Sequence, residues 1–547
     1  MKLFTSVLPN GKTEIRGDLI AGITLATVAI PQAIGYANIA GMPLATGLYT
    51  LLIPSLLFAV FASSRHLSIG ADSSTALILA GGLTAVAARG SADYISLALM
   101  VTLVVGILLI VSGILKLGFI ADFLSDTVMI AFLTGVGIVI MVEQIPGMLG
   151  ISNLGNGVVN IASAVFTHLD LVSFISIIIA AASLLIIFLS RKISRKIPDM
   201  LIVVIGSILI SIIFNLKSTI DTIGNVSQGL PSLTFPTADS FSMLPQMSLT
   251  IASLFLVAVA KSASLSRVYS SKSHDSFDEN RDLISLGIAN IGAGLTGAFI
   301  SSGTSGRTEV TYYAGGKGQF TQIVMSIIVI VVLVFLTAPL SNMPLAALSA
   351  IVFVIGLEMV DVKGLRSIIK KSKGEAIVAV ASIFAVVFLG VEIGIVFAMV
   401  ASLLFHVKSG YKPKNRLLVF KDGQFATLPV SSRKQALPGL IIYRFNSSMY
   451  YANAPTLRED LETLSNDVKW LCLDMSAVPS IDISAGDALI ESINNLKEKN
   501  VKVVFSDVDP DVSKDLLRLG ITYEVGPESF FKFPRDVVDA YEKSEYT

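Results

Sequence analysis

Fourteen long apolar runs restrict what this chain can fold into more than any other feature of its sequence. A helix needs about 20 apolar residues to cross a bilayer, because every backbone polar group there must be satisfied within the segment. The runs are 19–40, 44–62, 70–88, 94–115, 120–143, 171–190 and 198–216, followed by 246–268, 281–300, 303–315, 319–338, 344–361, 374–390 and 392–409. We therefore predict a polytopic α-helical membrane protein with 14 transmembrane segments. The weakest runs, 70–88 and 303–315, begin with small and polar residues.

The composition agrees with this prediction and excludes other classes of protein. Of the 547 residues, 53% are hydrophobic and 15% are charged, whereas about 25% of residues are charged in soluble domains. A soluble enzyme, a coiled coil and a disordered chain are therefore excluded. The 40 basic and 40 acidic residues balance, which argues against a nucleic-acid partner. The first apolar run is too long for a signal peptide, so we expect no cleavable signal.

The basic residues of the loops indicate which ends of the segments face the cytoplasm. With the N-terminus inside, only Arg89 and Lys217 fall in outside loops, and 22 basic residues fall in inside loops. The inside residues are Lys2, Lys12, Arg16, Arg65, Lys116, Arg191, Lys192, Arg195, Lys196, Arg267, Lys272, Arg281, Lys317, Lys363, Arg366, Lys370, Lys371, Lys373, Lys408, Lys412, Lys414 and Arg416. Cytoplasmic loops of membrane proteins carry such an excess. We therefore place the protein in the inner membrane with both termini cytoplasmic.

A soluble domain follows the last apolar run. Residues 417–547 hold 14 basic and 20 acidic residues. Strands are predicted at 439–450, 468–475 and 501–508, and helices at 455–466, 484–499 and 510–519, an alternation typical of an α/β domain. The expected organisation is a cytoplasmic segment 1–18, a transmembrane domain 19–409, a linker 410–436 and a cytoplasmic α/β domain 437–547.

Two short clusters of small and hydroxyl residues resemble each other, at 69–75 (IGADSST) and 300–306 (ISSGTSG). Each lies in the third run of its half, where an inverted repeat would bring two broken helices together in mid-membrane. A helix N-terminus offers free N–H groups and about half a positive charge, so two opposed N-termini suit a small anion. The hydroxyls of Ser73, Ser74, Ser302 and Thr304 can donate further hydrogen bonds. Alternatively, the small residues only allow close helix packing.

Two basic residues that belong to no loop, Lys261 and Arg307, fall inside predicted spans, and Asp72 is another ionisable residue near the start of such a span. Such groups are costly in a bilayer unless they have a partner or line a wet cavity. We expect Lys261 to place a fixed positive charge beside the anion, with Asp72 as its natural partner. Alternatively, Asp72 is a protonatable group that couples transport to protons. Arg307 can also be explained by a side chain that reaches out to the cytoplasmic end of its helix.

Other chemistries find no support. The stretch GAGLTG (292–297) matches the dinucleotide-binding glycine pattern, but it lies in a long apolar run without a preceding strand. The single cysteine, Cys472, excludes an intramolecular disulfide and a cysteine-built metal site. The four histidines lack the spacing of metal ligands, and there is no Walker A pattern or nucleophile–base set. We expect no cofactor, no metal and no enzymatic activity.

The sequence resembles the sulfate permease family, the bacterial and plant relatives of the solute carrier 26 anion transporters. The resemblance rests on DLIAGITLATVAIPQAIGYANIAGMPLATGLYT (18–50), ASSRHLSIGADSSTA (62–76) and ENRDLISLGIANIGAGLTGAFISSGTSGRTEVTYYAGGKGQ (279–319). In the tail, LDMSAVPSIDISAGDAL (473–489) resembles the signature of a STAS domain.

This resemblance implies a seven-plus-seven inverted repeat and a homodimer. A core domain (spans 1–4 and 8–11) is expected to move against a gate domain (spans 5–7 and 12–14) like an elevator. Members carry sulfate, bicarbonate, chloride and other halides, oxalate or C4-dicarboxylates, by symport, exchange or facilitated passage. By position, the implied substrate-binding residues are Gln32, Tyr36, Ala71, Asp72, Ser73, Lys261, Ser262, Ser301, Ser302, Gly303, Thr304 and Arg307.

Three positions depart from the family pattern. Lys261-Ser262 replaces the Glu-Ser pair that many bacterial members carry, so a resident cation takes the place of a coupling cation, which disfavours sodium symport. Ala71-Asp72 stands where a Pro-Thr-like pair is common, so coupling can rest on a Lys261–Asp72 pair. Ile300 replaces the usual proline before the serines of the tenth span.

Alternative functions on the same fold are an anion-conducting channel or a voltage-responsive protein. A nucleobase permease ranks lower, because such permeases use acidic residues in the eighth and tenth spans, where this chain offers Lys261 and only Glu309. In the tail, Ser484 aligns with the serine that is phosphorylated in soluble anti-sigma antagonists. Alternatively, Ser484 caps the following helix. The STAS domain is expected to serve regulation, docking of a cytoplasmic partner or dimer contact.

Overall fold

The computed structural model describes residues 4, 6–7, 12–119, 125–151, 157–194, 197–224, 226–411, 413–421, 423–464 and 468–545. Four of the basic residues counted in the inside loops, Lys2, Arg195, Lys196 and Lys412, lie outside these ranges. The chain forms two compact units, Met1–Ser402 and Leu403–Thr547.

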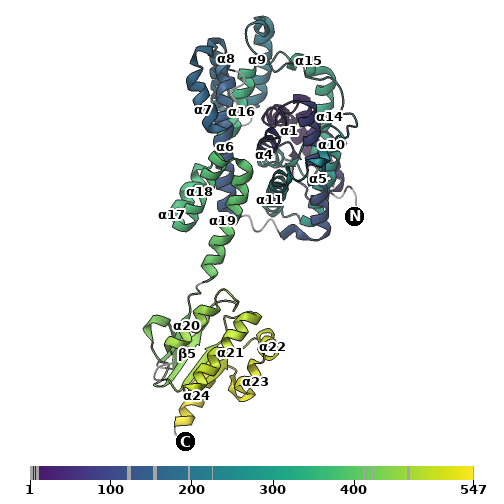
Figure 1. Cartoon of the computed structure of the whole chain (residues 1–547). Coiled ribbons are helices and arrows are strands. Elements are labelled where there is room, and N and C mark those ends of the chain that lie inside the picture. Colours follow the sequence, from purple (N-terminus) through teal and green to yellow (C-terminus); the bar gives the residue numbers. More distant parts are fainter. Residues whose placement is uncertain are drawn as a thin grey trace. The chain divides into compact units, whose positions relative to one another are not determined.

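Helices build the first unit, and each of the fourteen apolar runs coincides with helical structure (Figure 1). The helices of the first half are α1 (Lys12–Ile39), α2 (Leu44–Thr50), α3 (Ile53–Phe61), α4 (Ser73–Thr84), α5 (Ala92–Ile114), α6 (Asp126–Leu149), α7 (Val158–Thr167), α8 (Phe174–Ile193) and α9 (Asp199–Ile213). Those of the second half are α10 (Ala238–Ser242), α11 (Ser248–Ser273), α12 (Glu279–Leu295), α13 (Ser305–Tyr313), α14 (Phe320–Val331), α15 (Thr337–Leu340), α16 (Leu345–Met359), α17 (Val362–Lys371), α18 (Lys373–Leu389) and α19 (Val391–Tyr411). A π-helical segment, Val332–Leu336, joins α14 to α15.

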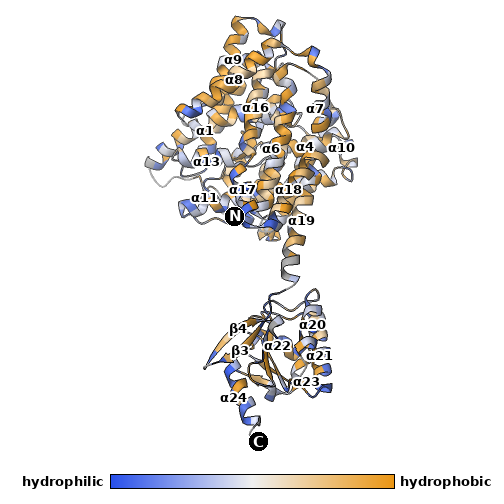
Figure 2. Cartoon of the chain, turned by 90° about the vertical axis from the view of Figure 1, so that its left-hand side faces the viewer, coloured by the Kyte–Doolittle hydropathy of each residue, from blue (hydrophilic) through white to orange (hydrophobic). Residues whose placement is uncertain are grey.

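Eight helical segments among the described residues are long and apolar enough to cross a membrane, and four shorter apolar helices accompany them. Large apolar side chains are exposed on α8, α9 and α18, among them Phe188, Leu209 and Phe384, and Figure 2 shows apolar residues along the same helices. Exposed apolar surface of this extent suits contact with lipid. The structure therefore has the helices of a multi-pass membrane protein.

The two weakest runs form short helices because each begins with extended chain. Residues Ile69–Gly70 (β1) and Ser302–Gly303 (β2) pair as antiparallel strands, with Ile69 opposite Gly303 and Gly70 opposite Ser302. The helices α4 and α13 begin directly after these strands. The two clusters that resemble each other in sequence are thus brought together, and each leads into a helix.

Helix packing in the first unit repeats between its two halves. Helix α4 packs on α11, and its counterpart α13 packs on α1. Likewise α5 packs on α12 and α14 on α3, while α16 packs on α8 and α6 on α18. Helices α1–α5 and α11–α14 form one group, which we call the core, and α6–α9 and α16–α19 form the second, the gate (Figure 1). This packing has the pattern expected of an inverted repeat.

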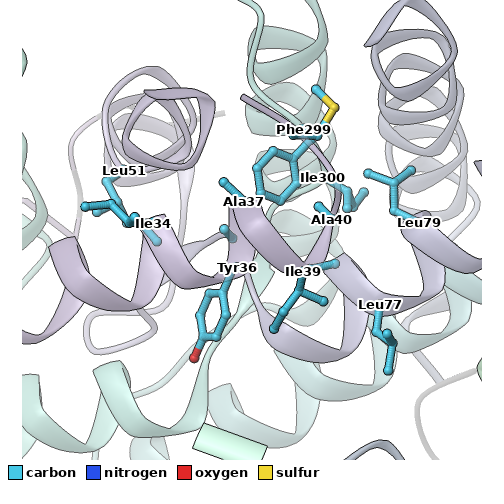
Figure 3. Close-up of a cluster of buried hydrophobic side chains, with 14 of the residues drawn as sticks. Ile34, Tyr36, Ala37, Ile39, Ala40, Leu51, Leu77, Leu79, Phe299 and Ile300 are labelled. Carbon is cyan, nitrogen blue, oxygen red and sulfur yellow. The ribbon is translucent and has the colours of Figure 1, made fainter. Parts of the chain in front are cut away.

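Buried apolar side chains hold the strand pair in place (Figure 3). Ile39 of α1, Leu79 of α4 and Phe299 before β2 are at most 1% exposed and belong to one cluster. Ile300, which stands where the family resemblance leads us to expect a proline, is fully buried in the same cluster. This isoleucine therefore contributes packing where a proline would fix the backbone.

The second unit contains a six-stranded sheet of order β4-β3-β5-β6-β7-β8. The strands are β3 (Arg416–Lys421), β4 (Gln424–Pro429), β5 (Leu440–Arg444), β6 (Trp470–Asp474), β7 (Lys502–Ser506) and β8 (Phe530–Phe531). Strands β5 to β8 are parallel, and β3 is antiparallel to both neighbours. The helices are α20 (Ala454–Leu464), α21 (Ile483–Glu498), α22 (Pro510–Arg518), α23 (Ile521–Val525) and α24 (Pro534–Glu545). One apolar cluster joins the sheet to α20 and α21, and a second joins it to α24.

The structure places two strands, β3 and β4, inside the segment 410–436 that we expected to be a linker. Leu417 and Leu418 of β3 are buried on opposite sides of the sheet, each in a different apolar cluster. The sequence carried a sign of this hairpin, since Asp422-Gly423 stands between two β-prone segments and Asp-Gly favours a two-residue turn. Lys412, Pro413 and Lys414, which come shortly before the first of these segments, are typical of a linker and hid the strand pattern.

The N-cap of α21 is Asp482, whose Oδ1 accepts a hydrogen bond from the Ala485 N–H at 2.7 Å. Its Oδ2 accepts a second hydrogen bond from the Tyr451 N–H at 2.8 Å. Ser484 is exposed and lies inside the first helical turn. The expectation that Ser484 caps this helix is therefore wrong, because the cap residue must precede the first turn.

We predict that Asp482→Ala lowers the free energy of unfolding of the second unit by about 1 to 2 kcal/mol, the usual effect of losing an N-cap. Ser484→Ala should change it by less than about 0.5 kcal/mol, as exposed substitutions do. Urea unfolding of a fragment spanning 403–547 measures both values. The single tryptophan, Trp470, lies in β6 against Tyr541 and reports unfolding by its fluorescence. Equal effects of the two variants would contradict the assignment of the cap.

Candidate functional site

A cavity of about 920 Å³ lies between the core and the gate of the first unit. Of the residues expected to bind substrate, seven line it: Gln32, Tyr36, Asp72, Ser73, Lys261, Thr304 and Arg307. They come from α1, the start of α4, the middle of α11 and the start of α13. Segments far apart in the sequence thus bring polar side chains to one cavity.

Lys261 and Asp72 form a buried ion pair at this cavity. The Lys261 Nζ lies 2.6 Å from the Asp72 Oδ2, and the two side chains are 7% and 6% exposed. Lys261 also donates to the Ser74 Oγ at 3.1 Å, and the Ser74 hydroxyl in turn donates to Asp72. A charge buried in this way keeps its ionised form only with such partners.

Asp72 also caps helix α4, because its Oδ2 accepts from the Ser74 N–H at 3.1 Å. The N-terminus of α4 is therefore partly occupied by a carboxylate of the chain itself. Thr304, the N-cap of α13, makes no side-chain capping bond to any residue that the structure describes, and Ser305 and Gly306 of its first turn line the cavity. The two helix N-termini are thus unequal, and α13 offers the more accessible N–H groups to an anion.

Arg307 is fully buried in the first turn of α13. Its Nε donates to the Thr304 Oγ1 at 2.8 Å, and its Nη2 donates to the Ala71 carbonyl at 2.6 Å. Its Nη1 is buried and has no hydrogen-bond partner within the described part of the chain. The idea that Arg307 reaches out to a helix end is therefore wrong. Helical side chains point toward the N-terminus, and here that direction leads to β1 and the cavity.

Five expected binding residues, all described, are absent from the cavity lining: Ala71, Ser262, Ser301, Ser302 and Gly303. The N–H groups of three of them are engaged elsewhere. Ala71 donates to the Thr50 Oγ1 at 2.9 Å, Gly303 to the Ser262 Oγ at 3.0 Å, and Ser301 to the Asn290 Oδ1 at 2.8 Å. These bonds hold β1 and β2 in place behind the cavity.

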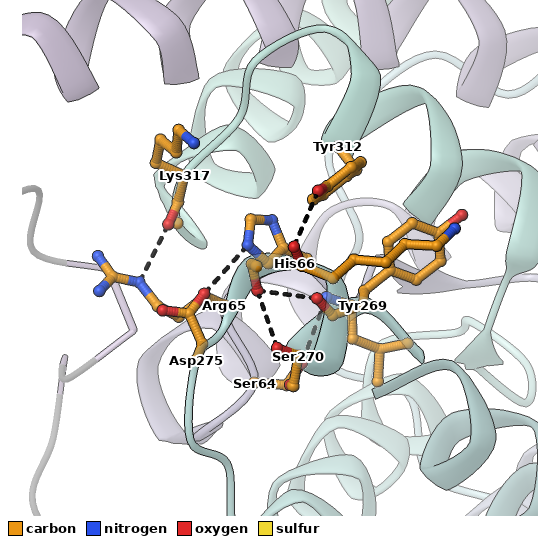
Figure 4. A network of polar contacts seen from close by, with 12 residues as sticks. Ser64, Arg65, His66, Tyr269, Ser270, Asp275, Tyr312 and Lys317 are labelled. Carbon is orange, nitrogen blue, oxygen red and sulfur yellow. Dashed lines mark hydrogen bonds and ion pairs between the residues drawn. The ribbon is translucent and has the colours of Figure 1, made fainter. Parts of the chain in front are cut away.

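Polar contacts at one end of the core anchor the segment that leads into β1 (Figure 4). His66 is 3% exposed, its Nε2 lies 3.2 Å from the Asp275 Oδ2, and its ring packs edge-on against Tyr312. The neighbouring Arg65 Nε donates to the Lys317 carbonyl at 3.0 Å. The residues before β1 are thus tied to the connections that follow α11 and α13.

The missing side chain of Gly70 makes room for Arg307. Gly70 has a φ of +146°, and a Cβ there would lie 2.8 Å from the Arg307 Nη1. We predict that Gly70→Ala weakens binding of a small anion in the cavity about tenfold or more, because backbone strain and the displaced guanidinium act together. Gly90→Ala is the matched control, with a φ of +74° and no atom of the described residues within 4 Å of the added Cβ. Equal affinity of the two purified variants for the anion would contradict this role of Gly70.

A family model described as "Sulfate permease family" matches residues 15–382. The chain belongs to the sulfate permease family. A second model, described as "STAS domain", matches residues 432–539. This sulfate permease family member is 28% identical to a "Probable sulfate transporter" of Mycobacterium tuberculosis, covering 97% of this chain and 96% of the relative. It is 29% identical to "Sulfate transporter 3.1" of Arabidopsis thaliana, covering 96% and 84%.

Two solved structures share its fold. The murine solute carrier 26 family member A9 anion transporter in the inward-facing state has a TM-score of 0.90 at 20% identity, covering 98% of this chain and 92% of the other. The transmembrane domain of a cyanobacterial bicarbonate transporter has a TM-score of 0.63 at 23% identity, covering 72% and 98%. The resemblance seen in the sequence is confirmed, and this sulfate permease family member is a multi-pass transporter, not an enzyme.

The gate of this sulfate permease family member also lines the cavity, with residues that the sequence did not single out. Arg191 of α8 pairs with both Asp199 of α9 and Glu358 of α16. From the sequence, Arg191 and Lys192 were interpreted only as basic residues of a cytoplasmic loop. The signal for Glu358 was a carboxylate inside the apolar run 344–361. In the core, the polar residue Asn290 inside the apolar run 281–300 was a similar signal, and it binds the Ser301 N–H.

Proposed function

We propose that this protein is a secondary or facilitative transporter of small anions such as sulfate, bicarbonate, chloride or a dicarboxylate. The observation that carries the proposal is the cluster of Lys261, Asp72 and Arg307 at the cavity. Two cations and one carboxylate leave one excess positive charge beside the first turn of α13. A small anion would find there a cation, the Arg307 Nη1 and free helix N–H groups.

The elevator mechanism is the second part of the proposal. The cluster belongs entirely to the core, whereas Arg191, Asp199 and Glu358 face it from the gate. A core that slides along the gate would carry the anion with it. Since the loop charges place Arg191 and Lys192 on the cytoplasmic side, the cavity corresponds to an inward-open state. We further propose that the chain crosses the membrane 14 times and that both termini are cytoplasmic. The protein would form a homodimer, and the STAS domain would regulate it.

The excess charge has a consequence for coupling. A monovalent anion would neutralise the site, whereas a dianion would leave one negative charge unless Asp72 took up a proton. We therefore assign proton coupling to Asp72 when the substrate is divalent. Sodium coupling is disfavoured, because Lys261 occupies the position that would have to attract the cation.

Uptake into proteoliposomes tests the proposal. Purified protein is compared for labelled sulfate, bicarbonate, chloride and fumarate, with and without inward proton and sodium gradients. Saturable uptake of one anion, stimulated by anion on the opposite side, is the expected result. Steady conductance without counterflow would identify a channel instead. Strict sodium dependence would refute the role given to Lys261.

A further inference from the structure

Glu392 is an ionisable residue in the first turn of α19, inside an apolar segment of the gate. Its Oε1 accepts a hydrogen bond from the Thr250 Oγ1 of core helix α11 at 3.0 Å. The Ser253 Oγ, one turn further along α11, lies 3.4 Å from the Glu392 carbonyl oxygen. A carboxylate that lies within an apolar membrane helix needs a polar partner, and the Thr250 hydroxyl supplies one. This carboxylate joins the gate to the core.

A third helix, α4, contacts Thr250 and Glu392 at the same place. Gly82 of core helix α4 is buried, and a Cβ at this position would collide with both the Thr250 hydroxyl and the Glu392 carboxylate. A glycine is therefore needed for α4, α11 and α19 to meet this closely. We call the contact of Gly82, Thr250 and Glu392 the gate–core junction.

The junction lies at the end of the core helices that points away from the anion cavity. Along α4, Gly82 follows Ser73 by nine residues, which is about 13 Å of helix. Along α11, Thr250 precedes Lys261 by eleven residues, or about 16 Å. Ser73 and Lys261 line the cavity, and Gly82 and Thr250 form the junction. The cavity opens at one end of these helices while the junction closes the other.

We propose that Glu392, through its hydrogen bond to Thr250, sets the conformational equilibrium of transport by holding the core against the gate in the inward-open state. This inference rests on the proposed elevator function. Sliding of the core carries Gly82 and Thr250 past Glu392, so the bond must break in every cycle. Glu392 touches no substrate in this scheme and acts as a positioning residue.

Loss of the bond therefore favours the outward-open state. A hydrogen bond to a charged group is strong enough for its loss to shift the equilibrium about tenfold. Thr250→Val removes the hydroxyl and keeps the shape of the side chain. Glu392→Gln keeps a weaker acceptor, and Thr250→Ser keeps the donor. The expected order of the inward-open fraction is wild type and Thr250→Ser, then Glu392→Gln, then Thr250→Val.

Accessibility of a cavity cysteine measures this fraction. Val28 of α1 lines the cavity, and Val28→Cys is modified by a membrane-impermeant thiol reagent from the cytoplasmic side of full-length protein in vesicles. The native Cys472 gives little background, because burial raises the pKa of its thiol to about 12. The initial rate of modification should fall with Thr250→Val, by up to about tenfold because a tenfold shift of the equilibrium changes the inward-open fraction by no more than that, and it should remain unchanged with Thr250→Ser.

The matched control is Thr102→Val in α5, whose hydroxyl is buried but donates to Ala98 within its own helix. An unchanged rate in Thr250→Val, or the same slow rate in Thr250→Ser or Thr102→Val, would overturn the inference. Failure of the proposed function looks different, because protein with the native Val28 would then take up no anion, and modification of Val28→Cys protein would not respond to anion. Intact uptake with a rate insensitive to Thr250→Val would reject only the junction.

Discussion

Lys261→Ala should abolish measurable anion uptake, and it should also destabilise the protein. Removing the ammonium leaves the Asp72 carboxylate buried at 6% exposure without its charged partner. Loss of one member of a buried ion pair costs roughly 3 to 5 kcal/mol. The excess charge of the cluster falls from one positive charge to none, because Arg307 then only balances Asp72. Proteoliposome uptake and thermal unfolding in detergent measure the two effects.

The double variant Lys261→Ala/Asp72→Asn separates the two effects. It removes both charges of the pair, so stability should return toward that of the wild type, and Arg307 again leaves one excess positive charge. Uptake of monovalent anions should recover in part, while proton-dependent uptake of dianions should stay lost. Full anion affinity in a well-folded Lys261→Ala protein would refute the resident cation.

Each apolar run marked the position of a helix, because run length and helix length are tied in a bilayer. Helices α7, α10 and α17 lie between the runs and were not predicted. The two weakest runs, 70–88 and 303–315, became α4 and α13, and their polar starts became β1 and β2. The strand pairing itself could not be predicted. Each strand has only two residues, which is too short for an alternation of apolar and polar residues to specify the register. The register is set here by packing and by the hydrogen bonds that Thr50, Asn290 and Ser262 accept.

The charged members of the site were predictable for a physical reason, namely that an ion inside an apolar run needs a partner. Lys261, Asp72 and Arg307 all reach the cavity. Ser301 and Gly303 were predicted by position, but the direction of a residue in a strand depends on pairing that the sequence does not reveal. Their N–H groups face Asn290 and Ser262 instead.

The contacts of the gate residues could not be predicted from the sequence. Arg191 and Glu358 are 167 positions apart in the sequence, and their pairing depends on how α8 packs against α16. No local pattern encodes that contact. The Glu392–Thr250 bond is of the same kind, since it joins two helices at the boundary between core and gate. Sequence alone therefore yields the charged site more readily than the contacts that control access to it.

Arg307→Ala should reduce anion uptake at least about 30-fold, because truncating one partner of a buried, hydrogen-bonded charge costs roughly 2 to 5 kcal/mol. The substitution removes the excess positive charge and leaves the Ala71 carbonyl without the bond that Nη2 supplies. Arg307→Lys keeps the charge, but an ammonium cannot reproduce the fixed fork that reaches Thr304 and Ala71 together. Its uptake should therefore lie between those of the wild type and Arg307→Ala.

Concentration dependence of uptake separates binding from transport in these variants. Arg307→Lys should raise the KM for the anion more than it lowers the maximal rate, because the charge is kept while its position is lost. Lys363→Ala is the matched control, since this basic residue is exposed on α17 and lies outside the cavity lining. If Arg307→Ala transported with the KM of Lys363→Ala, Arg307 would serve only to tie α13 to β1, and Lys261 would be the only charge that holds the anion.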